Sequence, residues 1–204
     1  IIPCIIYYLS FIFIFDITNI GTYTKQVIDY NVNMFQFHTG SLLYHPHQSP
    51  FYEWPFLVRP MLFRADLSLS GDFYGILCIS SPLFCWGGTI TMIMTLAYYI
   101  KTKDKKALFI LIGYFSVWLP WIFVKRSTFI YHYYPALIFV ALSWAYVINK
   151  IIDKKKWFVI GIVLLHIILF CIYYPVLSGS WTSEEYARRL ELFPSWMIDP
   201  YPEK

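Results

Sequence analysis

Four apolar runs along the chain are long enough to cross a lipid bilayer as helices. They cover residues 83–100, 107–124, 129–148 and 157–177, and none of them contains Asp, Glu, Lys or Arg. A helix rises about 1.5 Å per residue, so about 20 residues are needed to cross a hydrocarbon core about 30 Å thick. The pattern predicts an all-α integral membrane fold, a polytopic helix bundle in which residues 83–177 form four transmembrane helices.

A further apolar run covers residues 1–15 and is shorter than a typical membrane span. It starts without Met and without the basic residues that open a secretory signal peptide. We therefore interpret residues 1–19 as a truncated transmembrane helix, and we expect the chain to be a fragment of a longer protein.

The lysines orient the predicted bundle, because half of the 16 basic residues lie in two short connections between spans. They are Lys101, Lys103, Lys105, Lys106, Lys150, Lys154, Lys155 and Lys156. Cytoplasmic connections collect Lys and Arg, so we expect both connections to face the cytosol. The other connecting segments then share the external face: an external loop at 20–82, a short turn at 125–128 and a C-terminal tail at 178–204.

The predicted external loop is too long and too aromatic for a simple connection, which indicates a functional element lying on the membrane. Apolar residues recur with roughly helical spacing over 31–44, which predicts a juxtamembrane helix in the membrane interface. Residues 45–60 contain several prolines and are not expected to form a regular spanning helix. Residues 61–68 and 73–80 flank a Ser-Gly-Asp turn and predict a short β-hairpin.

The C-terminal tail predicts one short external helix. Ser183 is followed by Glu184 and Glu185, which is the pattern of a capping residue with acidic side chains in the first helical turn. Farther along, we expect Trp196 to anchor the tail at the membrane surface, because indole rings favour the membrane interface.

Composition excludes several classes of function. Apolar residues make up 58% of the chain and charged residues only 14%, which excludes a disordered chain and a basic nucleic-acid-binding groove. The cysteines lie in or beside apolar runs without CxxC spacing, and we interpret them as small apolar residues. The spacing His45-x-His47 lacks the further Cys or His of a structural zinc site. We therefore predict neither a metal site nor a cofactor.

Two cations occupy the short external turn, where the distribution of basic residues would disfavour them. Lys125 and Arg126 follow one predicted span directly and precede the next. One interpretation is that their side chains reach up to the phosphates of bilayer lipids. The other is that they bind a lipid-linked phosphate, for which a guanidinium offers two parallel hydrogen bonds.

Three motifs occur in an order and spacing that resemble a known family. The motifs are His-Pro-His-Gln-Ser-Pro-Phe-Tyr-Glu-Trp-Pro-Phe-Leu-Val-Arg-Pro at 45–60, Ser81-Pro82 leading into Cys-Trp-Gly-Gly at 85–88, and Phe-Ile-Tyr-His-Tyr-Tyr-Pro at 129–135. Together they resemble the C-terminal four-helix region of the protein O-mannosyltransferases, most closely the bacterial branch, over about residues 30–200. The chain departs from the family at Ser80-Ser81-Pro82, where Gly-Asn-Pro is frequent.

The resemblance implies a membrane glycosyltransferase of the GT-C superfamily. Such an enzyme moves mannose from a polyprenyl-phosphate carrier to Ser or Thr of exported proteins, at the external face of the plasma membrane. The family's catalytic carboxylate lies in a first external loop that this chain does not match. The resemblance therefore implies that the chain supplies the donor-side and structural half, with no catalytic residue of its own, and that its partners are the polyprenyl-phosphate mannose donor, a secreted or membrane protein acceptor and the lipid bilayer.

External cations and aromatic residues next to the spans are the candidates for donor binding. We predict that the donor phosphate is bound by Arg126, Arg59, Lys125 and His132. Contacts with sugar or lipid are expected from Trp54, Trp86, Tyr131, Tyr133 and His45. In an alternative interpretation Arg59 is structural and pairs with Glu53. Glu53 and Asp66 are also weaker candidates for the base that activates the acceptor hydroxyl, since a carboxylate beside arginines is usually an ion-pair partner.

Two other functions remain open from the sequence. A related GT-C transferase would use a different lipid-linked sugar, since fold kinship does not fix the donor. A non-catalytic membrane subunit would use the external loop to bind a partner. The spans contain no charged residue, which argues against an ion transporter.

Overall fold

The computed structural model describes residues 1–40, 45–68, 72–151 and 156–196. The chain forms two compact units. One, which we call the N-terminal unit, consists of Ile1–Leu43 with Val124–Arg126, and the other, the main unit, consists of Tyr44–Phe123 with Ser127–Lys204.

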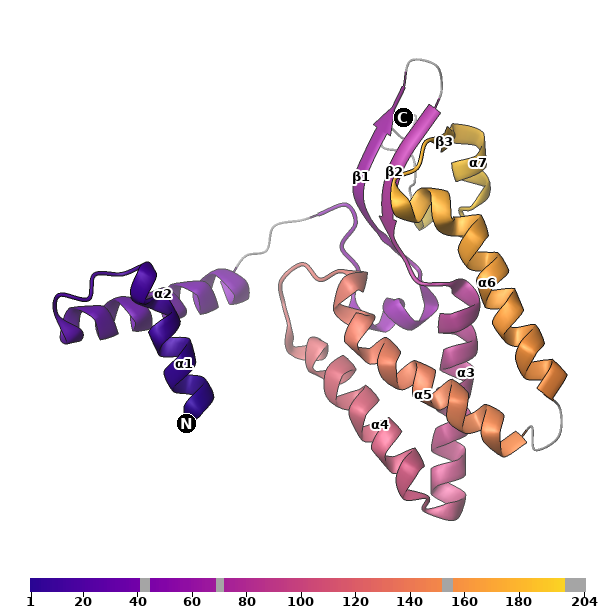
Figure 1. Cartoon of the computed structure of the whole chain (residues 1–204), viewed down its shortest axis with the longest axis horizontal. Helices are drawn as coiled ribbons and strands as arrows, with labels where there is room; N and C mark the ends of the chain where they lie inside the picture. The colour runs from indigo at the N-terminus through magenta and orange to yellow at the C-terminus, as the bar shows by residue number, and fades with distance from the viewer. Residues whose placement is uncertain (41–44, 69–71, 152–155, 197–204) are drawn as a thin grey trace. The chain divides into compact units, whose positions relative to one another are not determined.

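The N-terminal unit is a pair of helical segments packed through aromatic rings. A short apolar segment, α1 (Ile2–Ser10) with the 3-10 turn η1 (Phe11–Phe13), packs against α2 (Ile20–Gly40) (Figure 1). The helix predicted over 31–44 is thus the second half of a longer one, and residues 41–44 lie outside the described residues. Helix α2 starts before the predicted residue 31 because the Asn19 side chain accepts hydrogen bonds from the N–H groups of Gly21 and Thr22.

The main unit contains four long helices. They are α3 (Pro82–Thr102), α4 (Lys105–Trp118) continued by the 3-10 turn η3 (Leu119–Phe123), α5 (Tyr134–Ile151) and α6 (Lys156–Ser178). Among the described residues, α3, α4 with η3, and α6 are long and apolar enough to cross a membrane. The predicted helical membrane fold is confirmed. The span expected from residue 129 starts later, because the 3-10 turn η4 (Ile130–Tyr133) comes first.

Close approach at glycines packs α3, α4 and α5 together. A Cβ atom on Gly88 of α3 would lie 2.2 Å from Val140 Cγ1 of α5, and one on Gly113 of α4 would lie 2.0 Å from the Phe139 ring of α5. A buried hydrogen bond of 2.9 Å between the hydroxyls of Thr95 and Ser143 also joins α3 to α5. The fourth helix, α6, instead packs mainly against the sheet.

The predicted hairpin is confirmed by the antiparallel strands β1 (Met61–Leu67) and β2 (Asp72–Cys78). Its turn residues Ser70 and Gly71 lie outside the described residues. The sequence did not predict β3 (Thr182–Ser183), which pairs with β2 and gives the sheet order β1-β2-β3. The hairpin extends beyond the helices at the end opposite to the turn between α3 and α4 (Figure 1).

The C-terminal segment confirms one prediction and corrects another. Ser183 accepts a hydrogen bond from the Tyr186 N–H and caps α7 (Glu184–Arg189), as the sequence indicated. The expectation that Trp196 anchors the tail at the membrane surface is wrong. Trp196 lies in the 3-10 turn η5 (Pro194–Trp196), is fully buried in the core and donates its indole N–H to the Leu57 carbonyl at 2.8 Å.

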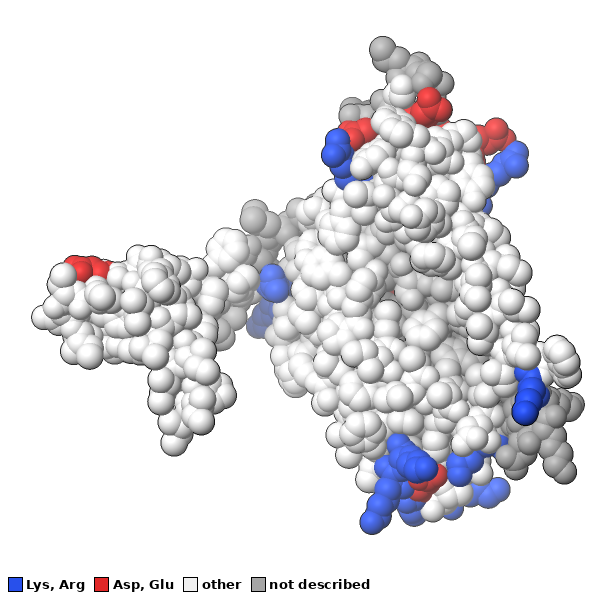
Figure 2. All heavy atoms as spheres, in the orientation of Figure 1, with Lys and Arg blue, Asp and Glu red and all other residues white. Residues whose placement is uncertain are grey.

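Charged side chains gather at the two ends of the main unit, and the surface between them is uncharged in the view of Figure 2. Exposed lysines cluster where α3 meets α4 and where α5 ends. Acidic and basic residues together mark the opposite end, around the sheet and α7. An uncharged band of this kind is what a protein surrounded by lipid requires.

Candidate functional site

Three segments that are far apart in sequence meet at the sheet end of the helices. The Ser49 N–H donates to the Thr128 carbonyl at 2.8 Å, and the Thr128 hydroxyl donates to the Ser49 carbonyl, also at 2.8 Å. The Trp86 indole of α3 donates to a carbonyl of the 3-10 turn η2 (Phe51–Phe56) at 2.8 Å. These bonds define the junction site, by which we mean residues 45–60 and 127–133 with Trp86.

Trp54 forms the core of the junction site. It is fully buried, and its indole N–H donates to the carbonyl and the hydroxyl of Ser49 at 3.2 and 3.0 Å. Its ring packs against the rings of Trp121, His132 and Tyr133. A direct contact between Trp54 and a sugar, expected from the sequence, would require this packing to open, so its observed role is to hold the site together.

His132 is held in a cage of aromatic rings. Its ring centroid lies 4.1 Å from that of Trp121 and 4.3 Å from that of Tyr131. The Phe129 main chain fixes the ring further, because its N–H donates to Nδ1 at 3.1 Å and its carbonyl oxygen lies 2.9 Å from the same atom. The imidazole is therefore positioned by its own turn and by the neighbouring rings.

A group of buried polar atoms lies in residues 45–60. Arg59 donates from Nη1 to the Gln48 carbonyl at 3.1 Å. Within the described part of the chain, Arg59 Nε, Glu53 Oε2 and His47 Nδ1 are buried without a hydrogen-bond partner, and Arg59 forms no ion pair with Glu53. Buried polar atoms are nearly always satisfied in folded proteins, so each of these atoms is available to a ligand or a bound water.

The pKa values of this group reflect burial among cations. Burial raises the pKa of Glu53 above its ordinary value, and the positive charge of Arg59 opposes that rise. Burial also lowers the pKa of His47, and the nearby His45 and Arg59 lower it further. For both groups, burial thus shifts the protonation equilibrium toward the neutral form.

The other predicted contacts differ in how accessible they are. Tyr131 and Trp86 each have just over a third of their surface exposed, so both can reach a ligand. Tyr133 is buried, and its hydroxyl lies 2.8 Å from that of Tyr114. His45 is partly buried, with its ring against Phe129 and its Nδ1 accepting a main-chain N–H from two residues later.

Two of the cations predicted to bind the donor phosphate belong to the N-terminal unit, whereas the junction site belongs to the main unit. Lys125 is exposed and Arg126 is partly buried, and both belong to the N-terminal unit. The junction site as described therefore has Arg59 as its predicted cation. Asp66, weighed as a base, instead pairs with Arg64 at 2.7 Å on the exposed face of the sheet.

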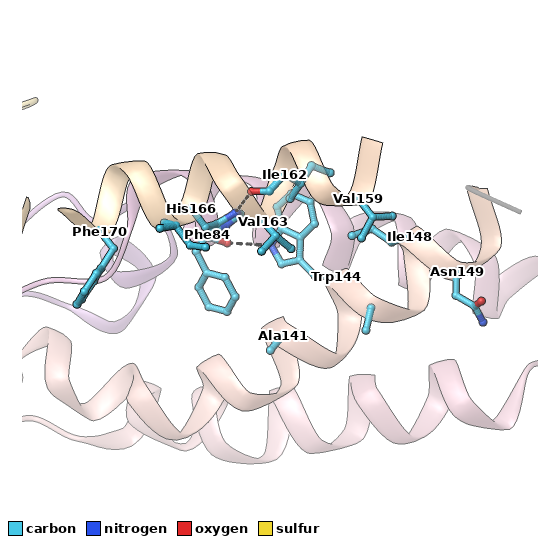
Figure 3. Close-up of a pocket in the computed structure, with 12 residues that line it drawn as sticks. Phe84, Ala141, Trp144, Ile148, Asn149, Val159, Ile162, Val163, His166 and Phe170 are labelled. Atoms are coloured by element: carbon cyan, nitrogen blue, oxygen red, sulfur yellow. Dashed lines mark hydrogen bonds between the residues drawn. The ribbon is translucent and has the colours of Figure 1, made fainter. Parts of the chain in front are cut away.

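An apolar groove between α5 and α6 has a volume of about 740 Å³ (Figure 3). His166 projects from the middle of α6, and its Nδ1 lies 2.8 Å from the Ile162 carbonyl of the same helix. Its Nε2 is buried without a partner among the described residues. Across the groove, the Trp144 indole donates to the Phe84 carbonyl at 3.1 Å.

Sequence reasoning missed parts of this arrangement. From the sequence, His47 was considered for a metal site and Glu53 for a base. Only the folded structure shows that both side chains are buried near Arg59. Gln48 was not singled out at all, although its amide oxygen accepts the Ser127 hydroxyl at 2.7 Å and its carbonyl binds Arg59. The available signal was the density of polar residues between prolines, which is unusual for a connection that carries no site.

Residues 23–196 match a family model described as the C-terminal four TMM region of protein-O-mannosyltransferase. Two curated relatives, from two strains of Mycobacterium tuberculosis, are named polyprenol-phosphate-mannose--protein mannosyltransferase. Each is 27% identical over 197 residues, which cover 84% of this chain and 37% of the relative. The chain thus spans little more than a third of the length of these relatives.

The fold is similar to that of a solved structure of the Saccharomyces cerevisiae protein O-mannosyltransferase Pmt1–Pmt2 complex bound to the sugar donor. The TM-score is 0.68 at 16% sequence identity, and the match covers 89% of this chain and 27% of that one. At this identity the similarity concerns the fold.

Proposed function

Because this chain belongs to the protein O-mannosyltransferase family, we propose that it is the donor-side membrane part of an enzyme that transfers mannose from a polyprenyl-phosphate carrier to Ser or Thr of exported proteins. The names of the curated relatives support this donor and a protein acceptor. The chain itself is a multi-pass membrane protein with apolar helices of spanning length.

The observation that carries the proposal is the unsatisfied Nε donor of Arg59 within the junction site. Transfer breaks the bond between the anomeric carbon and a phosphate oxygen, and it forms a bond from that carbon to the acceptor hydroxyl oxygen. Negative charge then accumulates on the departing polyprenyl phosphate, where a guanidinium donates strong, charge-assisted hydrogen bonds. The proton of the hydroxyl goes to a carboxylate that the family resemblance places outside this chain.

Other groups of the junction site fit a sugar phosphate. His132 and the accessible Tyr131 and Trp86 lie in the same junction site, and they offer a polar ring, a phenol and an indole face. Arg126 and Lys125 remain phosphate ligands in this proposal because of their place in the sequence, directly before the segment that holds Thr128.

The membrane orientation follows from the charges. The lysine-rich end of the main unit lies opposite the junction site, and cytoplasmic ends collect lysines. The proposal therefore places the junction site at the external face of the plasma membrane. There it meets the headgroup of a lipid-linked donor, and the apolar groove between α5 and α6 offers a lipid-facing surface for an isoprenoid chain.

The test is mannose transfer by the full-length protein in membrane vesicles, from polyprenyl-phosphate mannose to an acceptor peptide. Arg59→Ala and Arg126→Ala are compared with Arg189→Ala, which removes an exposed arginine that pairs with Glu185 on α7. Loss of a preorganised donor to the departing phosphate lowers turnover by about 100-fold or more. We expect such a loss for Arg59→Ala or Arg126→Ala, with Arg59→Lys retaining part of the activity, and wild-type turnover for Arg189→Ala.

Unchanged turnover in both Arg59→Ala and Arg126→Ala would remove the phosphate-site assignment. Offering the same vesicles a set of other lipid-linked sugars separates the alternatives. Transfer from a different sugar donor would favour a related GT-C transferase, and no transfer from any donor would favour a non-catalytic membrane subunit.

A further inference from the structure

The strand β1 lies at one edge of the small sheet. The sheet order is β1-β2-β3, and β3 pairs only with the first two residues of β2. In the part of the chain that the structure describes, no strand pairs with the outer edge of β1. An open edge presents a row of main-chain donors and acceptors that matches only another extended backbone.

The register shows which groups face this edge. The Ser68 N–H donates to the carbonyl of Asp72 directly opposite, at 2.8 Å. Opposed residues of antiparallel strands alternate between bonded and non-bonded pairs, so Asp66 and Arg64 bond to β2 and Ala65 between them does not. The N–H and carbonyl of Ala65 therefore point toward the open edge.

The open edge leads into the junction site. Its strand begins two residues after Arg59. Phe63 lies at the register shift between Leu62 and Arg64, is exposed and stacks on Tyr131, with ring centroids 6.2 Å apart and ring planes at 24°. Tyr131 is in turn 4.3 Å from His132 between ring centroids. A chain laid along β1 would thus run toward the groups assigned to the donor.

We propose that the acceptor polypeptide binds as an added β-strand along the outer edge of β1, which delivers its Ser or Thr hydroxyl to the junction site. This inference rests on the proposed function and names how its acceptor is held. Main-chain hydrogen bonds do not depend on side chains, so this mode would hold an acceptor by its backbone and leave its Ser or Thr hydroxyl free to react.

The side chains on β1 are compatible with such an occupant. Arg64 and Asp66 form an exposed ion pair of 2.7 Å, and the Arg64 guanidinium also lies over the Tyr74 ring of β2, 5.2 Å from its centroid. Both charged groups are thus occupied within the hairpin. An incoming strand therefore meets main-chain groups and the exposed Phe63 ring.

The test compares two acceptor peptides of identical sequence. One carries N-methyl groups on its odd-numbered amides, and the other carries them on its even-numbered amides. Binding of fluorescent peptide to the full-length protein in detergent is measured together with the KM for transfer. An added strand turns only every second N–H toward its neighbour. We therefore expect one of the two methylated peptides to bind at least tenfold more weakly and to have a KM at least tenfold higher than the unmethylated peptide. The other should change both values by less than twofold. An equal effect of the two parities would overturn the proposal.

A variant of the protein tests the same main-chain pairing by changing β1 and not the peptide. Ala65→Pro removes the outward N–H and leaves the bonds to β2 in place, whereas Ala65→Gly keeps the N–H. We expect Ala65→Pro to raise the KM for acceptor at least tenfold, with the KM for donor unchanged, and Ala65→Gly to behave as wild type. Thermal unfolding verifies the fold of each variant.

Two further outcomes are distinguishable. If the wild-type protein transfers no mannose but still binds peptide with a parity effect, the proposed function fails and the docking mode stands. If Ala65→Pro changes only the oligomeric state, measured by light scattering, the edge joins copies of the chain and the acceptor proposal falls.

Discussion

At the scale of single residues, the junction site is defined by polar atoms that the fold buries without satisfying. Arg59, Glu53 and His47 each keep one such atom, while their neighbours Ser49 and Thr128 are bonded to one another. An unsatisfied buried polar atom costs about 1–3 kcal/mol. The Nε–H of Arg59 is the cationic donor among them, which is why we assign the donor phosphate to Arg59.

The lowered pKa of His47 predicts a pH-dependent stability. The unfolded chain binds a proton near the ordinary value of 6.5, and the folded chain binds it only at lower pH. The contribution of His47 is therefore fully present above 6.5 and is lost as the pH falls through 6.5 toward the folded pKa. We expect His47→Gln to lose less stability than wild type between pH 7.5 and about pH 5.5, measured by unfolding in detergent.

A matched control sharpens this prediction. This control is His38→Gln, which replaces an exposed histidine on α2. Glu53 acts in the opposite sense, because its raised pKa gives stability that is lost as the pH rises through its ordinary value of 4.5 toward the folded pKa. Equal pH profiles for wild type and His47→Gln would contradict the burial of His47.

At the scale of elements, close packing of helices depends on where glycine removes a side chain. Gly87 and Gly88 let α3 approach α5, with Trp144 and Val140 filling the space that a Cβ would need. Gly161 on α6 has open space at the same place. The same residue type thus has different consequences in two helices, according to what lies opposite.

Alanine substitutions separate these two cases. Gly88→Ala would place a Cβ 2.2 Å from Val140 Cγ1, and overpacking of this kind costs about 1–3 kcal/mol. Gly161→Ala meets no atom within 4 Å, and it gains up to about 1 kcal/mol from helix propensity. We expect thermal unfolding in detergent to occur at lower temperature for Gly88→Ala and at the same or higher temperature for Gly161→Ala. Equal shifts in one direction would contradict the packing of α3 on α5.

At the scale of the whole molecule, the main unit has two chemically different ends separated by an uncharged band (Figure 2). One end consists of lysine-rich turns, and the other of the sheet, the junction site and α7. This polarity gives the chain one favoured orientation in a membrane.

Cysteine labelling in intact cells tests that orientation. In a background with the exposed Cys4 and Cys171 replaced by Ser, a membrane-impermeant maleimide should label Glu185→Cys directly and Lys103→Cys only after permeabilisation. The reason is that Lys103 lies at the lysine-rich end and Glu185 on α7. Labelling of both positions in the same compartment would contradict the orientation and the external placement of the junction site.

The sequence predicted the elements whose signals are local. Uncharged runs located the long helices, a Ser-Gly-Asp turn between two β-like segments located the hairpin, and Ser183 with Glu184 located α7. These predictions succeeded because hydrophobic length, turn chemistry and helix capping act over a few residues. The start of α2 was missed because the cap at Asn19 was overlooked beside a weak apolar pattern.

The sequence alone thus determined that this is a helical membrane protein with one lysine-rich side, and its motifs indicated the family. Only the tertiary structure decided that Trp54 and Trp196 are core residues, that Arg59 binds Gln48 and not Glu53, and that no described strand pairs with the outer edge of β1. The physical reason is that burial and pairing depend on contacts between segments up to 139 residues apart. No local pattern encodes which aromatic ring will be covered.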